Sequence, residues 1–268
     1  MPKSKKVILV ANDDGVDSQG ILVLARELKK IAKVVIVAPD REQSTMGHAL
    51  TLHKPVRISK VSVEPGLEVW ATSGTPADCV YLGLRKILKR KKPDLIVSGI
   101  NRGVNVGNDI YYSGTVAAAR EGAVMDIPAI ACSLDYTHSP GDENKFPFKG
   151  PALFMKKLVL DVLANGIKPR TVLNVNFPSC QWKQIKGVQL AKQGFRIYAD
   201  KVEEKKDTRG KPYFWLGGEY LGYKNIKESD CLYLDKKFIT ITPCKVDVTD
   251  YQQYDAIKEW SSVAGFQS

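Results

Sequence analysis

Two adjacent carboxylates follow a short apolar run near the start of the chain, in the stretch VILVANDDGVDSQG (7–20). The strand-forming residues 7–11 lead directly into Asn12, Asp13, Asp14 and a glycine. Two neighbouring negative charges at the end of a buried strand are costly unless a positive group neutralises them. An isolated segment of this kind is often only a polar turn, so a cation site needs further oxygen donors elsewhere in the sequence.

Such oxygen donors follow two other predicted strands. VVIVAP (34–39) is followed by DREQS (40–44), and DLIVSGI (94–100) is followed by Asn101, with Asn105 close behind. Ligands of an open parallel sheet collect at the carboxyl ends of its strands, so these groups are expected to meet at one edge. Carboxylates, an amide carbonyl, a hydroxyl and waters are what a hard divalent cation prefers. The pattern therefore predicts a divalent cation beside the Asp pair.

A second pattern is typical of anion binding. In IYYSGTVAAAREG (110–122), Ser113, Gly114 and Thr115 directly precede an alanine-rich segment predicted to be helical. Free N–H groups at a helix N-terminus bind phosphate, and a glycine lets the ligand approach the backbone. ATSGTPADCVYLGL (71–84) repeats the pattern. Simple N-capping is the alternative for either copy, and neither a Walker loop nor a GxGxxG fingerprint is present.

Cation ligands beside a phosphate site indicate phosphoryl chemistry, in which a metal polarises the phosphate and acidifies a bound water. His48, which follows Ser44 closely in the sequence, is a candidate general acid, with a purely structural role as the alternative. His53 and His138 lack any such context.

The elements that must position these groups are those of an α/β fold. Apolar β-branched runs alternate with segments of helical periodicity, which implies parallel strands joined by right-handed crossovers. Continuously apolar strands predict a sheet covered on both faces. The predicted strands are 7–11, 34–39, 94–100, 128–134 and 171–178, with strands and turns in 51–72, and the predicted helices are 18–32, 77–90, 116–125 and 152–164.

The chain changes character after about residue 185. Residues 186–235 are expected to form hairpins with a charged tip at 207–211, residues 238–244 a strand, and residues 250–263 a terminal helix. Residues 138–151 are rich in Pro, Gly and charge, which predicts a loop. We therefore divide the chain into a catalytic core, 1–185, and a hairpin-rich region, 186–268, whose strand 238–244 is expected to return to the core.

Composition limits the remaining possibilities. The 268 residues carry 40 basic and 29 acidic side chains, a net charge of +11, with lysine clusters such as RKILKRKKP (85–93) that indicate either solvated faces or attraction of anions. Five cysteines without a close CxxC pair argue against a disulfide framework and a thiolate zinc site. No signal peptide or membrane span is evident, so the sequence predicts a soluble, cytoplasmic protein.

Several long motifs, in order, resemble those of the SurE family of survival proteins, over about residues 6–250. They are ILVANDDGVDSQGI, VVIVAPDREQSTMGHALTL, SGTPADCV, DLIVSGINRGVNVGNDIYYSGTVAAAREG, LNVNFP, FWLGG and SDCLYLDKKFITITP. The family comprises metal-dependent 5′-nucleotidases and acid phosphatases of bacteria and archaea. Its members also act in some cases on 3′-nucleotides or short polyphosphate, and they form dimers, often tetramers, by exchanging C-terminal elements.

The resemblance implies a Rossmann-like, three-layer core with a mainly parallel sheet, a smaller C-terminal hairpin-rich part, and one divalent metal ion per subunit, Mg²⁺ or Mn²⁺. It implies catalytic roles for Asp13 and Asp14, and hydrolysis of nucleoside monophosphates by a metal-activated water. The partners it implies are a nucleotide substrate and further copies of the chain, whereas the sequence itself predicts no membrane partner and argues against nucleic acid. Carried over by position, the metal ligands are Asp13, Asp14, Ser44 and Asn101, and the phosphate or substrate contacts are Asn12, Asn105, Ser113, Gly114 and Thr115.

Two other functions compete with this interpretation. The first is a phosphatase that forms an aspartyl-phosphate on Asp13 or Asp14, although the usual DxDx[TV] spacing is absent. The second is a basic protein that binds nucleotides or nucleic acid without turnover, although no RRM, KH or helix-turn-helix signature is visible. Base preference depends on the pocket walls, for which Tyr111, Tyr112 and Trp215 are candidates.

Overall fold

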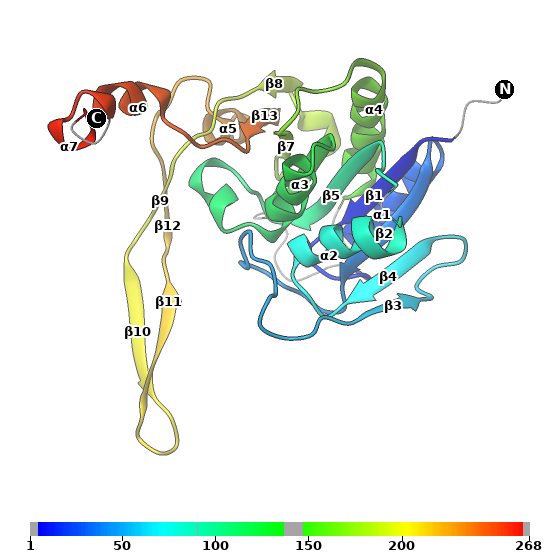
Figure 1. The fold of residues 1–268 in the computed structure, drawn as a ribbon, viewed down its shortest axis with the longest axis horizontal. Helices are drawn as coiled ribbons and strands as arrows, with labels where there is room; N and C mark the ends of the chain where they lie inside the picture. The colour runs from blue at the N-terminus through cyan, green and yellow to red at the C-terminus, as the bar shows by residue number, and fades with distance from the viewer. Residues whose placement is uncertain (1–4, 90, 137–146, 265–268) are drawn as a thin grey trace.

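A large mixed sheet forms the centre of the molecule. The computed structural model describes residues 5–89, 91–136 and 147–264, and within them nine strands pair in the order β3-β4-β2-β1-β5-β6-β7-β13-β8 (Figure 1). These strands are β1 (Val7–Ala11), β2 (Lys33–Pro39), β3 (Ile58–Val61), β4 (Glu68–Thr72), β5 (Leu95–Arg102), β6 (Ala129–Leu134), β7 (Thr171–Phe177), β8 (Val188–Leu190) and β13 (Ile239–Lys245).

Most neighbouring strands are parallel, as the alternation of strands and helices predicts. The antiparallel pairs are β3 with β4 and β13 with β7. From β1 the chain first adds β2 and β4 on one side, and later β5, β6 and β7 on the other. The strand order therefore reverses between β1 and β5, and ligands of open α/β sheets bind at such a switch point.

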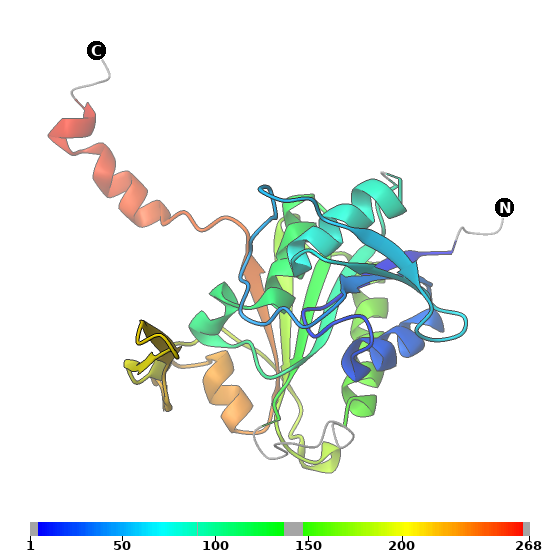
Figure 2. The same ribbon diagram turned by 90° about the horizontal axis from the view of Figure 1, so that it is seen from below.

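Helices cover both faces of the sheet (Figure 2). Ile8 and Val10 of β1 pack in one apolar cluster with the helices α1 (Gln19–Lys29) and α4 (Lys149–Asn165). The alternate residues of β1, Leu9 and Ala11, pack in a second cluster with α2 (Pro76–Leu82) and α3 (Gly114–Val124). The other helical segments are η1 (Gly83–Ile87), η2 (Gly107–Tyr111), η4 (Trp182–Gln184), α5 (Asp230–Asp235), α6 (Tyr251–Lys258) and α7 (Ser261–Ala264). The α/β class predicted from the sequence is confirmed.

Residues 196–223 form a long arm that projects from the body of the molecule (Figure 1). Its base is the antiparallel pair β9 (Arg196–Tyr198) and β12 (Tyr220–Tyr223), and its outer part is the hairpin of β10 (Lys201–Lys206) and β11 (Pro212–Gly217). At the tip, the Asp207 carboxylate accepts hydrogen bonds from the backbone N–H groups of Arg209 and Lys211. The hairpins and charged tip expected from the sequence are therefore present.

Part of the C-terminal region belongs to the main sheet. Both β8 and β13, which lie beyond residue 185, pair within the main sheet, whereas α6 and α7 extend away from it (Figure 2). Most of the predicted loop 138–151 lies outside the described residues. In the described ranges, no helix has the length and apolar character needed to cross a membrane.

Candidate active site

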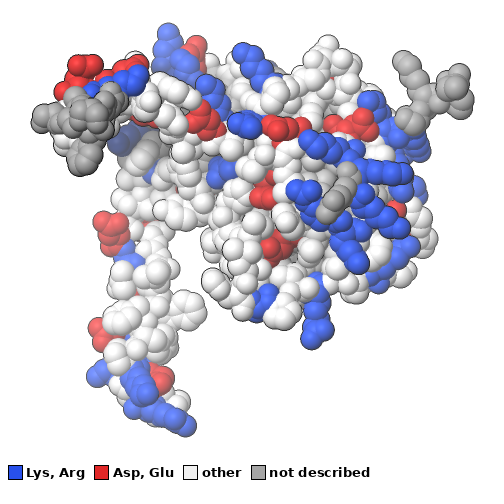
Figure 3. Space-filling view, in the orientation of Figure 1, with Lys and Arg blue, Asp and Glu red and all other residues white. Residues whose placement is uncertain are grey.

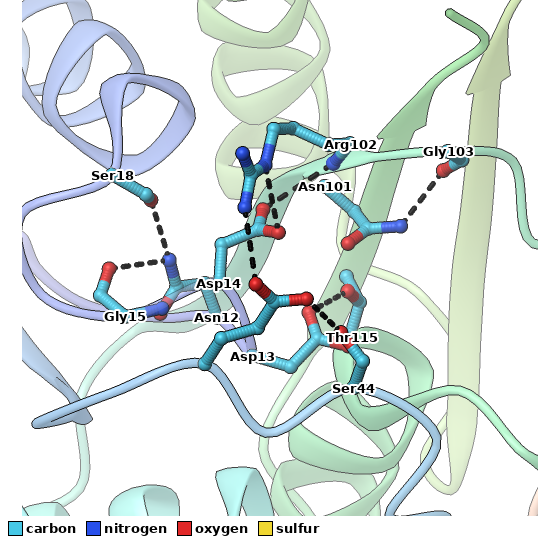
Figure 4. A network of polar contacts seen from close by, with 11 residues as sticks. Asn12, Asp13, Asp14, Gly15, Ser18, Ser44, Asn101, Arg102, Gly103 and Thr115 are labelled. Carbon is cyan, nitrogen blue, oxygen red and sulfur yellow. Dashed lines mark hydrogen bonds and ion pairs between the residues drawn. The ribbon is translucent and has the colours of Figure 1, made fainter. Parts of the chain in front are cut away.

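The loops after β1, β2 and β5 converge at the switch point and bring together side chains distant in sequence (Figure 4). Asp13 and Asp14 follow β1, Ser44 lies in the loop after β2, and Asn101 is near the end of β5. The backbone N–H of Gln43 donates to the carbonyl of Asp13 at 2.8 Å. The loop that carries Ser44 is thereby hydrogen-bonded to the loop that carries the Asp pair.

Asp14 is paired with an arginine that the sequence did not single out. Arg102 donates to the Asp14 carboxylate from its backbone N–H and from Nε, each at 3.3 Å. Its Nη2 also contacts the Glu42 carboxylate at 3.4 Å, and the Ser44 hydroxyl donates to the same carboxylate. Arg102 therefore supplies part of the positive charge that the buried pair requires and connects two loops.

Asp13 lies beneath the N-terminus of α3. The Thr115 hydroxyl donates to Asp13 Oδ1, and a Cβ built on Gly114 would lie 2.8 Å from both Cβ and Oδ2 of Asp13. Only glycine fits at position 114 without a shift of one of these groups. The carboxylate pair and the start of the helix are therefore in direct contact.

Burial raises the pKa of both carboxyls. For Asp14, loss of solvent is the largest cause and the charge of Asp13 the second, and together they raise its pKa from 3.8 to about 7 against the opposing effect of Arg102. Burial likewise raises the pKa of Asp13, partly offset by the hydrogen bond from Thr115. The charge of Arg102 alone is thus not enough to neutralise the two carboxylates. A bound cation would stabilise their charged forms.

The oxygen donors around the pair suit a cation of the Mg²⁺ type. Asn101 Nδ2 donates to the carbonyl of Gly103 at 2.7 Å, which leaves the amide oxygen turned toward Asp14 (Figure 4). In the described ranges, no three His, Cys, Asp or Glu side chains gather as a metal site. A cation here would therefore be held by the Asp pair, neutral oxygens and water, a set that Mg²⁺ and Mn²⁺ accept.

The N-terminus of α3 opens into the same region. Ser113 is the N-cap, and its hydroxyl accepts from the backbone N–H of Val116 at 3.0 Å. Thr115 is fully buried and uses its hydroxyl on Asp13. The Val116 N–H is capped by Ser113 and the Thr115 N–H is bonded to Asp13. An anion at this end of the helix would consequently meet the remaining N–H groups of the first turn, rather than the Thr115 hydroxyl.

The second hydroxyl–glycine–hydroxyl segment, 73–75, has a different role. Thr75 and Asp78 form a reciprocal capping box at the start of α2, and the Asp78 carboxylate accepts from the backbone N–H of Thr75 at 2.9 Å. Asp78 also accepts from Thr51. A carboxylate of the chain itself occupies this helix end, which favours N-capping, the other interpretation given for this segment, over phosphate binding.

The two asparagines expected to contact substrate, Asn12 and Asn105, form hydrogen bonds within the protein. Asn12 is fully buried, and its Nδ2 donates to the carbonyl of Gly15 and to the Ser18 hydroxyl, each at 2.8 Å. Asn105 donates from Nδ2 to the Ser133 hydroxyl at 2.8 Å, and its carbonyl accepts from Asn174 and Asn176 of β7. Asn105 borders the cavity described next, whereas Asn12 does not.

A cavity of about 1080 Å³ joins the switch point to the base of the arm. Asp13, Ser44, Asn101 and Ser113 line one end. Residues that sequence reasoning missed line the rest, chiefly Arg102, Asp109, Tyr136, Arg196, Tyr198 and Lys201. Of the three aromatic residues proposed from the sequence, Tyr112 borders this cavity, whereas Tyr111 borders a separate hollow and Trp215 borders neither.

The wall at the arm is a compact charged and aromatic cluster. Arg196 Nη1 lies 2.6 Å from Asp109 Oδ2, and the Tyr198 hydroxyl donates to the same oxygen at 2.7 Å. The Arg196 guanidinium stacks 4.0 Å from the centre of the Tyr220 ring. No sequence motif signals this cluster, because η2 supplies Asp109 and the arm supplies the other three residues.

The chain is similar to known proteins over most of its length. A family profile described as "Survival protein SurE" matches residues 8–200.

The chain belongs to the SurE family.

Curated SurE relatives resemble it over nearly their whole length. A protein of Caldanaerobacter subterraneus subsp. tengcongensis named "5′-nucleotidase SurE" is 42% identical over 257 residues, which are 96% of this chain and 98% of that protein. One of the same name from Syntrophotalea carbinolica is 43% identical over 255 residues, 95% of this chain and 97% of that protein. The crystal structure of the SurE protein from Aquifex aeolicus has a TM-score of 0.79 and 41% identity, covering 94% of this chain and 98% of that one.

Proposed function

We propose that this SurE-family protein is a 5′-nucleotidase that releases phosphate from nucleoside monophosphates with the help of one bound divalent cation, Mg²⁺ or Mn²⁺. The names of its relatives support the reaction. The observation that carries the proposal is the contact of Asp13 with Gly114 and Thr115. It puts Asp13 against a helix N-terminus suited to phosphate, and Asp13 and Ser113 line the same cavity, whereas Asp14 lines a smaller hollow that shares Arg102 with it.

Asp13, Asp14, Ser44 and Asn101 would hold the cation. When bound, it would polarise the phosphoryl group and lower the pKa of a water molecule. The N–H groups at the start of α3 orient the phosphate, and Arg102, which lines the cavity, adds positive charge near it. Asp13 and Asp14 are the carboxylates positioned to accept the proton of the attacking water.

The cavity also supports a broader substrate range. Its volume of about 1080 Å³ is at the upper end of ordinary ligand pockets, and Arg102, Arg196 and Lys201 line it. We therefore include 3′-nucleotides and short polyphosphate among the substrates to test. The cavity wall formed by Arg196 and Tyr198 of the arm would face the base or sugar of a nucleotide whose phosphate lies at the N-terminus of α3.

The decisive experiment measures phosphate release from a panel of nucleoside monophosphates, with Mg²⁺, Mn²⁺ or a chelator, for the wild type and Asp14→Asn. We expect metal-dependent release that falls by more than about 100-fold in the variant, because changes even in residues that merely support metal ligands cost about 10–100-fold. Asp17→Asn is the matched control, since Asp17 lies exposed in the same loop. Absence of release from folded wild-type protein with every metal would favour the non-catalytic binding protein instead.

The same preparation distinguishes water attack from an aspartyl-phosphate intermediate. Acid quenching during turnover of ³²P-labelled nucleotide should leave no label on the protein if water attacks phosphorus directly. Stable label that is lost in Asp13→Asn or Asp14→Asn would instead support the covalent alternative.

We further propose that residues 186–268 serve assembly, as a homodimer or homotetramer, and add one wall of the cavity, while residues 1–185 carry the cation and phosphate site. Many large apolar side chains of this region are exposed, including Trp215 and Leu216 of the arm and Tyr254 of α6.

All five cysteines, which lie within the described residues, are free, in keeping with the cytoplasmic location expected from the sequence.

A further inference from the structure

The loop after β2, residues 40–57, carries Ser44 across the mouth of the site but has little packing to hold it. It contains no helix or strand, and most of its residues are exposed. Its large apolar side chains point largely outward, because Met46 is 43%, Leu50 41% and Leu52 80% exposed. A segment with so few buried apolar contacts depends on polar contacts for its position.

Backbone contacts secure the loop at several points. Gln43 is bonded to Asp13, and the Gly47 N–H donates to the carbonyl of Tyr112 at 3.0 Å. Farther along, the Thr75 hydroxyl donates to the carbonyl of Ala49 at 2.6 Å. Glu42 and Thr51 also contact the body through Arg102 and Asp78. Between Gln43 and Ala49, the side-chain contact with the body that is found among the described residues is that of His48, whose Nε2 is 2.9 Å from Glu121 Oε2.

The partner of His48 is a deeply buried carboxylate. Glu121 is 4% exposed and belongs to α3, the helix whose N-terminus carries Ser113 and Gly114. Among the described residues, His48 is the side chain that hydrogen-bonds its carboxylate. A buried carboxylate without a partner is strongly unfavourable, so His48 and Glu121 stabilise each other's position.

We propose that His48 and Glu121 form a positioning pair that holds the Ser44 loop against α3, so that the cation ligand Ser44 and the phosphate-binding helix end keep a fixed separation. The inference rests on the proposed function, because it concerns the same site. His48 does not border the main cavity, and its Nε2 faces Glu121. It therefore acts through Ser44 and not as the general acid suggested by the sequence.

The first test does not depend on activity. Hydrogen exchange of the chelator-treated protein is compared for the wild type, His48→Ala and His48→Gln. We expect the amides of residues 43–49 to exchange at least about 10-fold faster in His48→Ala, because local opening of the loop becomes easier. His48→Gln, which keeps an N–H donor at a similar reach, should restore most of the protection. His53→Ala is the matched control, since His53 is exposed in the same loop.

The second test measures the Mn²⁺ concentration for half-maximal phosphate release. It should rise by about 10–100-fold in His48→Ala, as for other residues that orient metal ligands, with kcat at saturating Mn²⁺ nearly unchanged. A fall in kcat with unchanged loop protection and metal requirement would overturn positioning in favour of a direct catalytic role. If His48→Ala changes neither amide exchange in residues 43–49 nor the kinetics of phosphate release, His48 has neither a positioning nor a catalytic role.

The double variant His48→Ala/Glu121→Gln separates positioning from stability. It removes the unpaired buried charge, so its Tm should recover relative to His48→Ala while loop exchange stays fast. Recovery of loop protection together with Tm would contradict the proposal, because stability alone would then explain the single variant. If the wild type releases no phosphate at all, the proposed function fails, but the exchange experiment still decides whether the pair holds the loop.

Discussion

The paired carboxyls Asp13 and Asp14 make the stability of the cation-free protein depend on pH. The pKa of Asp14 is raised in the folded state to about 7, against 3.8 for the ordinary group. Between these pH values the folded protein keeps a proton on Asp14 that the unfolded chain releases. Folding then takes up a proton, so stability from this group is greatest at low pH and is lost as pH rises toward 7.

A cation should remove this penalty, which gives the first prediction. Adding Mn²⁺ should raise the Tm more at pH 8, where both carboxylates are charged, than at pH 5, where protons compete with the metal. Thermal melts with and without chelator at the two pH values measure this difference. In chelator at pH 8, Asp14→Asn should melt above the wild type, because it removes one of the two buried charges. An equal Mn²⁺ effect at both pH values would contradict the prediction.

Gly114 gives the second prediction at the residue scale. A Cβ at this position would lie 2.8 Å from Asp13 Cβ and Oδ2, so Gly114→Ala should displace the carboxylate or the start of α3. Overpacking of this kind costs about 1–3 kcal/mol. We expect a measurable fall in Tm and a loss of phosphate release, because the cation and phosphate sites share this contact. Wild-type activity in Gly114→Ala would refute the importance of the contact.

At the scale of elements, Asp230 connects η2 with the segment that precedes the arm through hydrogen bonds. Its carboxylate accepts from the backbone N–H groups of Gly107 at 3.0 Å, Gly194 at 2.8 Å and Cys231 at 2.8 Å. The segment that follows Gly107 carries Asp109, Tyr112 and Ser113 into the cavity. A buried acidic residue that does not itself line the cavity thus positions one wall of the site.

The third prediction is that Asp230→Ala destabilises the protein by about 2–3 kcal/mol, because it leaves buried N–H groups unpaired. It should also raise KM for a nucleotide more than it lowers kcat, since substrate-facing residues move while Asp13 and Asp14 stay in place. Urea unfolding and steady-state kinetics measure the two effects. Asp230→Asn keeps one acceptor oxygen and should lie between wild type and Asp230→Ala in both.

At the scale of the whole molecule, the arm is an exposed two-stranded ribbon. Figure 3 shows charge concentrated near its tip and uncharged surface along much of its length. Trp215 is 61% and Leu216 is 83% exposed. A two-stranded hairpin is marginally stable alone in water, and apolar surface of this kind is typical of protein interfaces.

The fourth prediction is therefore that Trp215→Glu lowers the mass of the protein in size-exclusion chromatography with light scattering. Arg209→Glu at the tip is the matched control and should leave the mass unchanged. Because Leu216 and Tyr198 border the cavity, loss of assembly should also raise KM for nucleotide. An unchanged mass would show that the arm does not hold copies together.

The positive charge is divided between two regions. Arg85, Lys91 and Lys92 of the sequence cluster 85–93 line a hollow between η1 and the end of α3, whereas Arg102, Arg196 and Lys201 line the cavity. Figure 3 shows Lys and Arg gathered on the side of the molecule that carries α2 and β4. Arg102 and Arg196, which are proposed to meet substrate, therefore lie outside the sequence cluster 85–93, whereas Lys201 belongs to the basic segment 200–211.

The sequence by itself determined the α/β class and the position of the Asp pair, Ser44, Asn101 and the segment 113–115. It could do so because each of these signals is local: polar groups at the end of an apolar strand or the start of a helix. Parallel topology then requires such ends to meet at one edge.

Only the tertiary structure decided how these groups are partnered. Arg102 reaches Asp14, the Thr115 hydroxyl turns to Asp13, His48 pairs with Glu121, and the arm closes the cavity with Arg196 and Tyr198. Tertiary structure also separated two similar helix starts, because the Asp78 carboxylate caps α2 away from the cavity, whereas Asp13 and Ser113 at the start of α3 line the cavity. Each of these contacts joins residues far apart in the chain, and its geometry depends on packing that no local pattern encodes.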